Sequence, residues 1–355
     1  METVVQSLFD HRIITGTGAL KALESQLQML DDRRLAVLCD EHTFRHCYPV
    51  LLKEIPLLKD AAVITVPAGE EHKTIGQAVH VWTELTRLQM GRNDIVLNLG
   101  GGVITDLGGF AAANYLRGIP FIQIPTSLLA MVDASLGGKT GVDLNHAKNR
   151  VGVVAFPMAV YCWPGFLHTL PALEWESACG EVLKHALLAG DALWSHFTGH
   201  GLGTASVVSK LDQLQQVKLE VVSADPHEKG RRKVLNFGHT MGHALESESL
   251  AAGRQLPHGF AVAWGMIMEL EIAALKGIMS DVLSAELKGR LHALMVLPDI
   301  SGLPVNHLMD WVMLDKKNDH QKVMMSLISS VGHPLWNIEV EPSLIRSVFQ
   351  KYVQE

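Results

Sequence analysis

Hydrophobic residues follow different patterns in the two halves of the chain. The first half contains short, continuously apolar runs with many β-branched residues, at 35–40, 61–67, 94–102 and 121–127. Such runs are typical of strands buried on both faces of a parallel sheet. Between them, residues 74–90 place apolar side chains at helical spacing. This alternation predicts a mostly parallel sheet covered by helices.

In the second half, the hydrophobic residues mostly follow helical spacing. From about Pro171 onward nearly all of the periodicity is helical, with Gly and Pro between the segments. The predicted helices span 172–190, 206–224, 239–250, 258–277, 281–293 and 342–353. The run VMMSLIS within 315–336 predicts one short strand. We therefore expect an α/β domain over 1–168 and an α-helical domain over 169–355.

Composition narrows the class of protein. The 355 residues are 48% hydrophobic, which is enough for sizeable cores, and the formal net charge is −7. This charge argues against a nucleic-acid-binding protein, which needs a basic surface. The N-terminus lacks a signal-peptide pattern, and no apolar stretch approaches the ~20 residues that span a bilayer. Four cysteines without paired spacing fit a reducing cytoplasm.

The glycine-rich segment 97–112 is predicted to run from a strand into a helix. Glycines let backbone amides approach a pyrophosphate, although the spacing is not GxGxxG and a tight turn is the alternative. Two features favour a ligand site over a plain turn: Asp106 is predicted to lie in the turn, and the segment lies at the carboxyl end of a predicted strand. Asp40 ends an earlier strand, where it could bind ribose hydroxyls or cap a helix. Glu70 and Lys73 follow another strand, in what alone is a solvated loop.

Residues 115–149 form a polar, glycine-rich segment with several charges. Lys139 follows two glycines, so its backbone could approach a ligand closely. Lysine and asparagine side chains in such loops suit phosphate and hydroxyl groups, and an exposed basic loop is the alternative. Asp133 lies inside an apolar run, where a carboxylate needs a partner, and this favours a site.

Histidines and one glutamate suggest a metal centre. Glu181, on a predicted helix, shares a face with Lys184 and His185, and a surface ion pair is the alternative. His239 and His243 lie four residues apart, and His258 precedes another helix. Glu181 with two of these histidines would form a catalytic zinc site with an open position. The spacing alone leaves open which two histidines bind the metal. Thr240 excludes the HExxH pattern.

The most specific segments resemble one known family. They are LRGIPFIQIPTSLLAMVDASLGGKTGVD, HAKNRVG, GEVLKH, RRKVLNFGHTMGHALE and PHGFAVAWGM, within residues 40–317. Together they resemble the 3-dehydroquinate synthase family, whose wider superfamily includes other sugar-phosphate cyclases and, more distantly, metal-dependent polyol dehydrogenases. The resemblance implies an NAD-binding domain followed by a helical metal-binding domain.

The resemblance also implies roles for individual residues. The implied metal ligands are Glu181, His239 and His258. The implied NAD⁺-binding residues are Asp40, Glu70, Lys73, Gly101, Gly102, Val103, Asp106, Thr126, Ser127, Lys139, Lys148, Phe166 and Thr169. The implied substrate-binding residues are Asp133, Lys139, Lys148, Asn149, Lys184, Lys218, Arg232, Asn236, His243 and one of Lys316 and Lys317. Arg117 matches a family residue that reaches into a neighbouring subunit's site, which implies a homodimer. Gly180 replaces a usual Ala, and Phe260 a common Glu.

The implied activity converts 3-deoxy-D-arabino-heptulosonate 7-phosphate into 3-dehydroquinate and phosphate, in the shikimate pathway of the cytoplasm. NAD⁺ and a divalent metal, zinc or cobalt, would be the cofactors. The alternatives are a valiolone- or inosose-type cyclase, a polyol dehydrogenase, and a non-catalytic NAD-binding module. Lys218 and Arg232 suit a substrate carboxylate, for which the rival cyclases have less use. Several phosphate-binding cations argue against a dehydrogenase.

Overall fold

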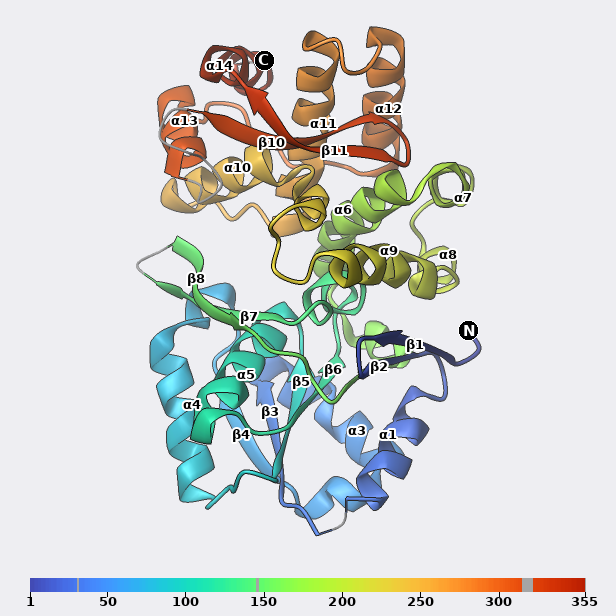
Figure 1. The fold of residues 1–355 in the computed structure, drawn as a ribbon, viewed down its shortest axis with the longest axis vertical. Coiled ribbons are helices and arrows are strands. Elements are labelled where there is room, and N and C mark those ends of the chain that lie inside the picture. Colours follow the sequence, from blue (N-terminus) through green and yellow to red (C-terminus); the bar gives the residue numbers. More distant parts are fainter. Residues whose placement is uncertain (31, 145–146, 315–321, 355) are drawn as a thin grey trace. The chain divides into compact units, whose positions relative to one another are not determined.

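A computed structural model of the chain describes residues 1–30, 32–144, 147–314 and 322–354. By internal packing the chain divides into two compact units, Met1–Pro171 and Ala172–Glu355 (Figure 1). The functional boundary at 168/169 stays a prediction. Lys316 and Lys317 lie outside the described residues.

The first unit is built on a seven-stranded sheet. Its strands are β1 (Val4–Leu8), β2 (His11–Thr15), β3 (Leu35–Asp40), β4 (Ala62–Val66), β5 (Ile95–Gly100), β6 (Phe121–Pro125) and β9 (Ala159–Cys162). The order is β1-β2-β9-β6-β5-β3-β4, and every neighbouring pair except β1–β2 is parallel. The four strands predicted from apolar runs form one half of the sheet.

Helices cover both faces of the sheet, because strands that are apolar along their whole length expose hydrophobic side chains on both faces. The helices of this unit are α1 (Ala19–Gln28), α2 (Glu41–His46), α3 (Tyr48–Glu54), α4 (Ile75–Arg87) and α5 (Gly102–Asn114). In Figure 1, α4 and α5 lie on one side of the sheet, and α1 and α3 lie on the other. All six residues of β5 are buried, as a central parallel strand should be.

The strand order reverses between β3 and β5. The chain passes from β3 outward to β4, and β5 then pairs with β3 on its other side. Parallel α/β sheets bind ligands beyond the carboxyl ends of the strands at such a switch point. Asp40 and Gly100 are the last residues of these two strands, so the topology places the predicted NAD⁺ segments at this edge.

Five strands of the first unit were not predicted from the sequence. β7 (Lys139–Leu144) and β8 (Ala147–Val154) form a separate antiparallel hairpin, while β1, β2 and β9 extend one edge of the main sheet. The hairpin lies in the glycine-rich polar segment, where no apolar run or regular alternation indicates a strand. β1 and β2 are only five residues long.

The second unit is mainly helical. Its main helices are α6 (Ala172–Ala189), α7 (Asp191–His200), α8 (Thr204–Val208), α9 (Leu211–Ala224), α10 (His239–Ala251), α11 (His258–Leu275), α12 (Asp281–Leu294), α13 (Val305–Leu314) and α14 (Pro342–Val353). α11 packs against both α6 and α10 (Figure 1). The predicted helices are confirmed, except that 206–224 is two helices with a break near Lys210; α7 and α13 were not predicted.

This unit also contains a β-hairpin. The strand predicted at VMMSLIS is β10 (Val323–Ser330), and it pairs antiparallel with β11 (His333–Val340). Ser326 on β10 donates a hydrogen bond to the carbonyl of Lys233 at 2.6 Å, so the hairpin supports the short 3-10 helix η6 (Arg231–Asn236).

α11 is the one helix in the described parts of the chain that is long and apolar enough to cross a membrane by length and composition. Most of that helix, 72%, is buried inside the helical unit. Core helices pass the same test, and α11 occupies such a core position between α6 and α10.

Candidate metal centre and active site

Three helices of the second unit bring metal-binding side chains together. Glu181 lies on α6, His239 is the first residue of α10, and His258 is the first residue of α11. Oε1 of Glu181 is 3.3 Å from Nε2 of His239 and 3.5 Å from Nε2 of His258. Tetrahedral coordination with bonds of about 2.0–2.1 Å puts neighbouring ligand atoms roughly 3.3 Å apart. The spacing of these donors therefore fits a shared cation.

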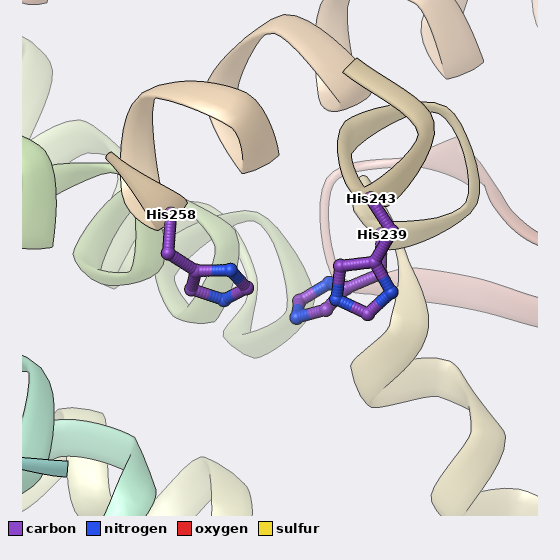
Figure 2. A group of neighbouring side chains, drawn as sticks. All are labelled: His239, His243 and His258. Carbon is purple, nitrogen blue, oxygen red and sulfur yellow. The ribbon is translucent and has the colours of Figure 1, made fainter. Parts of the chain in front are cut away.

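His243 belongs to the same cluster. Ligand atoms of His239, His243 and His258 lie within 4.8 Å of one another, and Figure 2 shows the three imidazoles converging on a common space. His243 follows His239 by one helical turn, so both project from the same face of α10.

The carboxylate of Glu181 is buried and poorly satisfied. Neither of its oxygens accepts a well-aligned hydrogen bond from any residue that the structure describes, although Nζ of Lys184 lies 2.5 Å from Oε2. Burial alone would raise the pKa of Glu181, but Lys184 and the imidazole of His239 outweigh it and hold this pKa well below its usual range. Glu181 is therefore an anion whose Oε1 has room for a cation.

The two histidines facing Glu181 differ in protonation. Burial, then the charge of Lys184, lowers the pKa of His239 to about 4, so its imidazole is neutral. Its Nδ1 lies 3.2 Å from the carbonyl of Phe237 and must donate there, which leaves the lone pair of Nε2 facing the carboxylate. Burial would lower the pKa of His258, but Glu246 and Glu181 raise it to about 9. The lone pair of His239 Nε2 and the anionic carboxylate of Glu181 repel each other, and a cation bound between them would remove this repulsion.

Glu246 was missed by sequence reasoning. Its Oε2 lies 3.2 Å from Nδ1 of His258, on the side of the ring away from Glu181. A carboxylate behind a histidine ligand fixes the tautomer and orientation of the ring. Since residues 239, 243 and 246 share a face of one helix, their spacing could have indicated this carboxylate.

The cationic residues predicted for the substrate are also placed by the helical unit. Lys184 on α6, Lys218 on α9 and Arg232 on η6 are all buried. Arg232 donates from Nη1 to the carbonyl of Pro226 at 2.7 Å, and its backbone N–H donates to Asp225. Asn236 donates to Glu228 at 2.9 Å, and lines a small pocket with Thr240 and the β10–β11 hairpin.

At the carboxyl edge of the sheet, the NAD⁺ candidates occupy the ends of β3, β5 and β6. Oδ1 of Asp40 accepts from the amides of His42 and Thr43 at 2.9 and 2.8 Å, so this residue caps α2. Gly101 precedes α5, and a Cβ atom there would lie 3.3 Å from Oγ of Ser127. The helix begins at Gly102, so the expectation that Asp106 lies in the turn was wrong; it lies on α5.

Lys73 organises a charged cluster in the α/β unit. Its Nζ is buried and lies 2.7 Å from Glu70, 3.4 Å from Asp106 and 3.7 Å from Asp143. It also donates to Oδ1 of Asn149 at 3.0 Å. Burial lowers the pKa of Lys73, but the three carboxylates outweigh it and raise this pKa above its usual value. The fold thus joins residues that the sequence left in separate loops.

Two members extend this cluster toward the β7–β8 hairpin. Nζ of Lys148 lies 3.7 Å from Glu70, and Oδ1 of Asp143 accepts from the amide of Asn149 at 2.7 Å. Asp143 was not predicted, because nothing in its local pattern distinguishes it from an ordinary hairpin aspartate.

The remaining candidates are spread over the first unit. Asp133 is half-buried on the π-helical turn η4 (Ala130–Ala134), and Lys139 is exposed at the start of β7. Arg117 is exposed, with φ of 68°. Thr126 and Phe166 are buried, and Oγ1 of Thr169 lies 3.5 Å from Sγ of Cys47.

Comparison with known proteins decides the family. The 3-dehydroquinate synthase N-terminal model matches residues 63–177, and the corresponding C-terminal model matches residues 178–318. A 3-dehydroquinate synthase of Parabacteroides distasonis is 40% identical over 71% of this chain and 73% of its own length. The chain belongs to the 3-dehydroquinate synthase family. It is therefore an enzyme of the cyclase type, a lyase.

Solved structures confirm the fold. A 2-deoxy-scyllo-inosose synthase in complex with carbaglucose-6-phosphate, NAD⁺ and Co²⁺ has a TM-score of 0.87 at 24% identity, over 99% of this chain and 100% of that one. A 2-epi-5-epi-valiolone synthase from Streptomyces hygroscopicus with NAD⁺ and Zn²⁺ has a TM-score of 0.77 at 28% identity, over 90% of each chain. The expected α/β domain followed by a helical domain is confirmed.

One departure from the usual 3-dehydroquinate synthase pattern has a structural reason. A Cβ atom at Gly180 would collide with the backbone carbonyl of Gly259 and lie 3.1 Å from its Cα. The close approach of α6 to the start of α11 sets Glu181 beside His258. Phe260, the other departure, is buried, and Glu246 already provides a carboxylate partner for His258.

Proposed function

We propose that Glu181, His239 and His258 hold the catalytic divalent cation of this enzyme, zinc or cobalt. The single observation that carries this assignment is the convergence of one carboxylate oxygen and two imidazole nitrogens at 3.3 and 3.5 Å. Two imidazoles and a carboxylate are a typical catalytic zinc set with an open position. Bound there, the cation supplies Lewis acidity for the substrate's hydroxyl groups.

NAD⁺ is assigned to the carboxyl edge of the sheet. The backbone of Gly101–Val103 forms the N-terminus of α5, which favours a pyrophosphate. Oδ1 of Asp40 already accepts two cap hydrogen bonds, so Oδ2 is the oxygen assigned to ribose hydroxyls. Bound NAD⁺ supplies a reversible acceptor for the hydride of the substrate's carbon-5 alcohol and ends the cycle unchanged.

The substrate assigned is 3-deoxy-D-arabino-heptulosonate 7-phosphate, an acid with two anionic ends. Arg232 and Lys218 are assigned to the carboxylate, since a guanidinium offers a bidentate fork. The phosphate is assigned to Lys139, Asn149, Asn236, His243 and a lysine of the pair Lys316/Lys317. Asp133 and Lys184 are assigned to hydroxyl groups. The substrate's own phosphate is the proposed base for the proton lost during elimination.

The proposal includes a homodimer in the cytoplasm. Its support is the exposed Arg117, which corresponds by its motif to a family residue that completes a neighbouring subunit's site. No role in binding nucleic acid or membrane is proposed.

The rival function is another sugar-phosphate cyclase, because the two solved structures described above have that activity. The carbaglucose-6-phosphate bound by the first of them has no carboxylate, unlike the heptulosonate. Buried Arg232 and Lys218 favour the acid, because a guanidinium offers a carboxylate a bidentate fork and the lysine adds a second positive charge.

A substrate panel tests the choice. Phosphate release is measured with the heptulosonate 7-phosphate, sedoheptulose 7-phosphate and glucose 6-phosphate, for the wild type, Arg232→Lys and the exposed-neighbour control Arg231→Lys. We expect the wild type to prefer the heptulosonate, and Arg232→Lys to lower kcat/KM for it by about 10–100-fold. The control should match the wild type. Faster release from either of the other two sugar phosphates would overturn the assignment.

A further inference from the structure

Glu269 is a fully buried carboxylic side chain in the middle of α11, among apolar neighbours such as Met268 and Leu270. It contacts the beginning of α10. Oε2 accepts from the amide of Gly238 at 2.6 Å, and Oε1 accepts from the amides of Thr240 and Met241 at 3.1 and 3.2 Å. One side chain of α11 therefore caps the helix that begins with His239.

α10 needs this cap because its own N-cap residue cannot provide one. The first N–H groups of a helix have no partner within the helix. The residue at the cap position is Gly238, which has no side chain and adopts a left-handed backbone, with φ of 81°. A serine or aspartate, the usual capping residues, would be strained there. The acceptor must come from another element, and α11 provides it.

The backbones of α10 and α11 lie close enough for this contact because of Gly265. A Cβ atom at Gly265 would collide with the carbonyl oxygen of Gly238 and lie 2.8 Å from the amide nitrogen of Gly242. Glu269 follows Gly265 by four residues and so projects from the same face. His258, seven residues before Gly265, shares that face as well. One face of α11 therefore carries both His258, a proposed metal ligand, and Glu269, which caps α10. The first residue of α10 is His239, another proposed ligand.

We propose that Glu269 is a positioning residue for the metal centre, which it serves by fixing His239 before the ion binds. The inference rests on the assignment of His239 and His258 as metal ligands. The amides of Gly238 and Thr240, on either side of His239, both donate to Glu269, and the imidazole itself is oriented by the carbonyl of Phe237. A ligand held in place in this way loses little freedom when the metal binds.

Glu269→Gln tests the role with little change of shape. Its amide group presents a donor to backbone donors, so at least one of the three N–H groups loses its acceptor. We expect the Kd for Zn²⁺, measured by competition with a chromophoric chelator, to rise about 10-fold or more. The visible absorption of the Co²⁺-loaded protein should change as well, because it reports ligand geometry.

Ser280→Ala is the matched control. Oγ of Ser280 caps α12 by accepting from the amide of Leu283 at 3.2 Å, so this change removes a helix cap from a different helix. It should lower Tm and leave the Kd for Zn²⁺ and the Co²⁺ spectrum unchanged. If Glu269→Gln behaves in the same way as this control, Glu269 is only structural and the inference is overturned.

Two further results separate the possible failures. A wild-type protein that binds neither Zn²⁺ nor Co²⁺ overturns the metal assignment itself, whereas equal binding by wild type and Glu269→Gln overturns only the positioning role. If Glu269→Gln does not fold, hydrogen exchange on the wild type decides. The amides of Gly238, Thr240 and Met241, which donate to Glu269, should be protected without metal as strongly as with Zn²⁺, and protection that arises only with Zn²⁺ would overturn the inference.

Discussion

Nδ1 of His258 lies 3.2 Å from Oε2 of Glu246, and the opposite nitrogen of the same imidazole faces Glu181. Glu246 is buried on α10, whereas His258 begins α11, so the contact ties the two helices together beside the proposed metal. A carboxylate in this position makes the imidazole a stronger and better oriented ligand.

Replacing Glu246 with Gln should weaken metal binding. The expected rise in the Kd for Zn²⁺ is about 10–100-fold, because the imidazole loses its anionic partner. Chelator competition measures it. Glu248→Gln is a matched control, since Glu248 is also buried on α10 but binds His307 and Trp311, at 3.1 and 3.0 Å. An equal rise in the Kd for Zn²⁺ in both variants would show that the contact of Glu246 with His258 does not strengthen metal binding.

His239 and His243 should differ in function although they share a face of α10. His239→Asn should abolish metal binding, because Nε2 of His239 is the nitrogen that faces Glu181 at 3.3 Å. His243→Asn should keep the metal and lower kcat by about 100-fold, as expected for a group that acts on the substrate. Metal content and steady-state kinetics on both variants check this. Loss of metal from His243→Asn would reassign the ligands.

Gly180→Ala should separate α6 from the start of α11. The new Cβ would collide with the Gly259 backbone, so we expect a loss of about 1–3 kcal/mol in the free energy of unfolding together with weaker Zn²⁺ binding. Gly199→Ala is the control: Gly199 lies on α7 with open space around it, and this change should stabilise by about 0.5–1 kcal/mol. Denaturant titration measures both. A Gly180→Ala variant as stable as the wild type would show that α6 and α11 can move apart without loss of stability.

The ion pairs of Glu271 should make part of the stability depend on pH. Burial would raise the pKa of Glu271, but hydrogen bonds from Lys288 and Lys351 outweigh it and lower this pKa below its usual value of 4.5. A lowered folded-state pKa stabilises the fold above the unfolded-state pKa, and this contribution is lost as pH falls through the folded-state pKa. Glu271→Gln should therefore lower Tm at pH 7, with the difference from wild type shrinking below pH 4.5.

Glu286→Gln, which removes an exposed carboxylate from α12, is the control for Glu271. Thermal unfolding of the three proteins is compared across the acidic range. A Tm difference for Glu271→Gln that stays constant from neutral pH to well below 4.5 would contradict the ionic origin of the effect.

Features with a local cause could be predicted from the sequence. The shared face of Glu181 and Lys184 follows from helical periodicity alone, and their contact at 2.5 Å bears it out. The central strands were visible because strands covered on both faces are continuously apolar. The spacing of Glu246 from His239 and His243 places it on their face of α10, but its contact with His258 depends on the packing of two helices, which no local pattern encodes.

Other features were hidden by their composition. The β7–β8 hairpin is made of residues among glycines and charges, so it carries no strand pattern, although it brings Asn149 to Lys73. Glu269 looks like an interruption of an apolar helix until its three backbone partners are known. Residues that join distant segments need the fold before they can be recognised.

We propose that the protein is a metal-dependent cyclase with an internal redox cycle. The most direct test mixes the protein with NAD⁺, Zn²⁺ or Co²⁺, and 3-deoxy-D-arabino-heptulosonate 7-phosphate, and follows phosphate release and NADH absorbance together. We expect one phosphate per substrate with no accumulating NADH, and we expect this release to be abolished by a chelator and restored by added metal. Accumulating NADH without phosphate, or phosphate release unaffected by the chelator, would contradict this proposal.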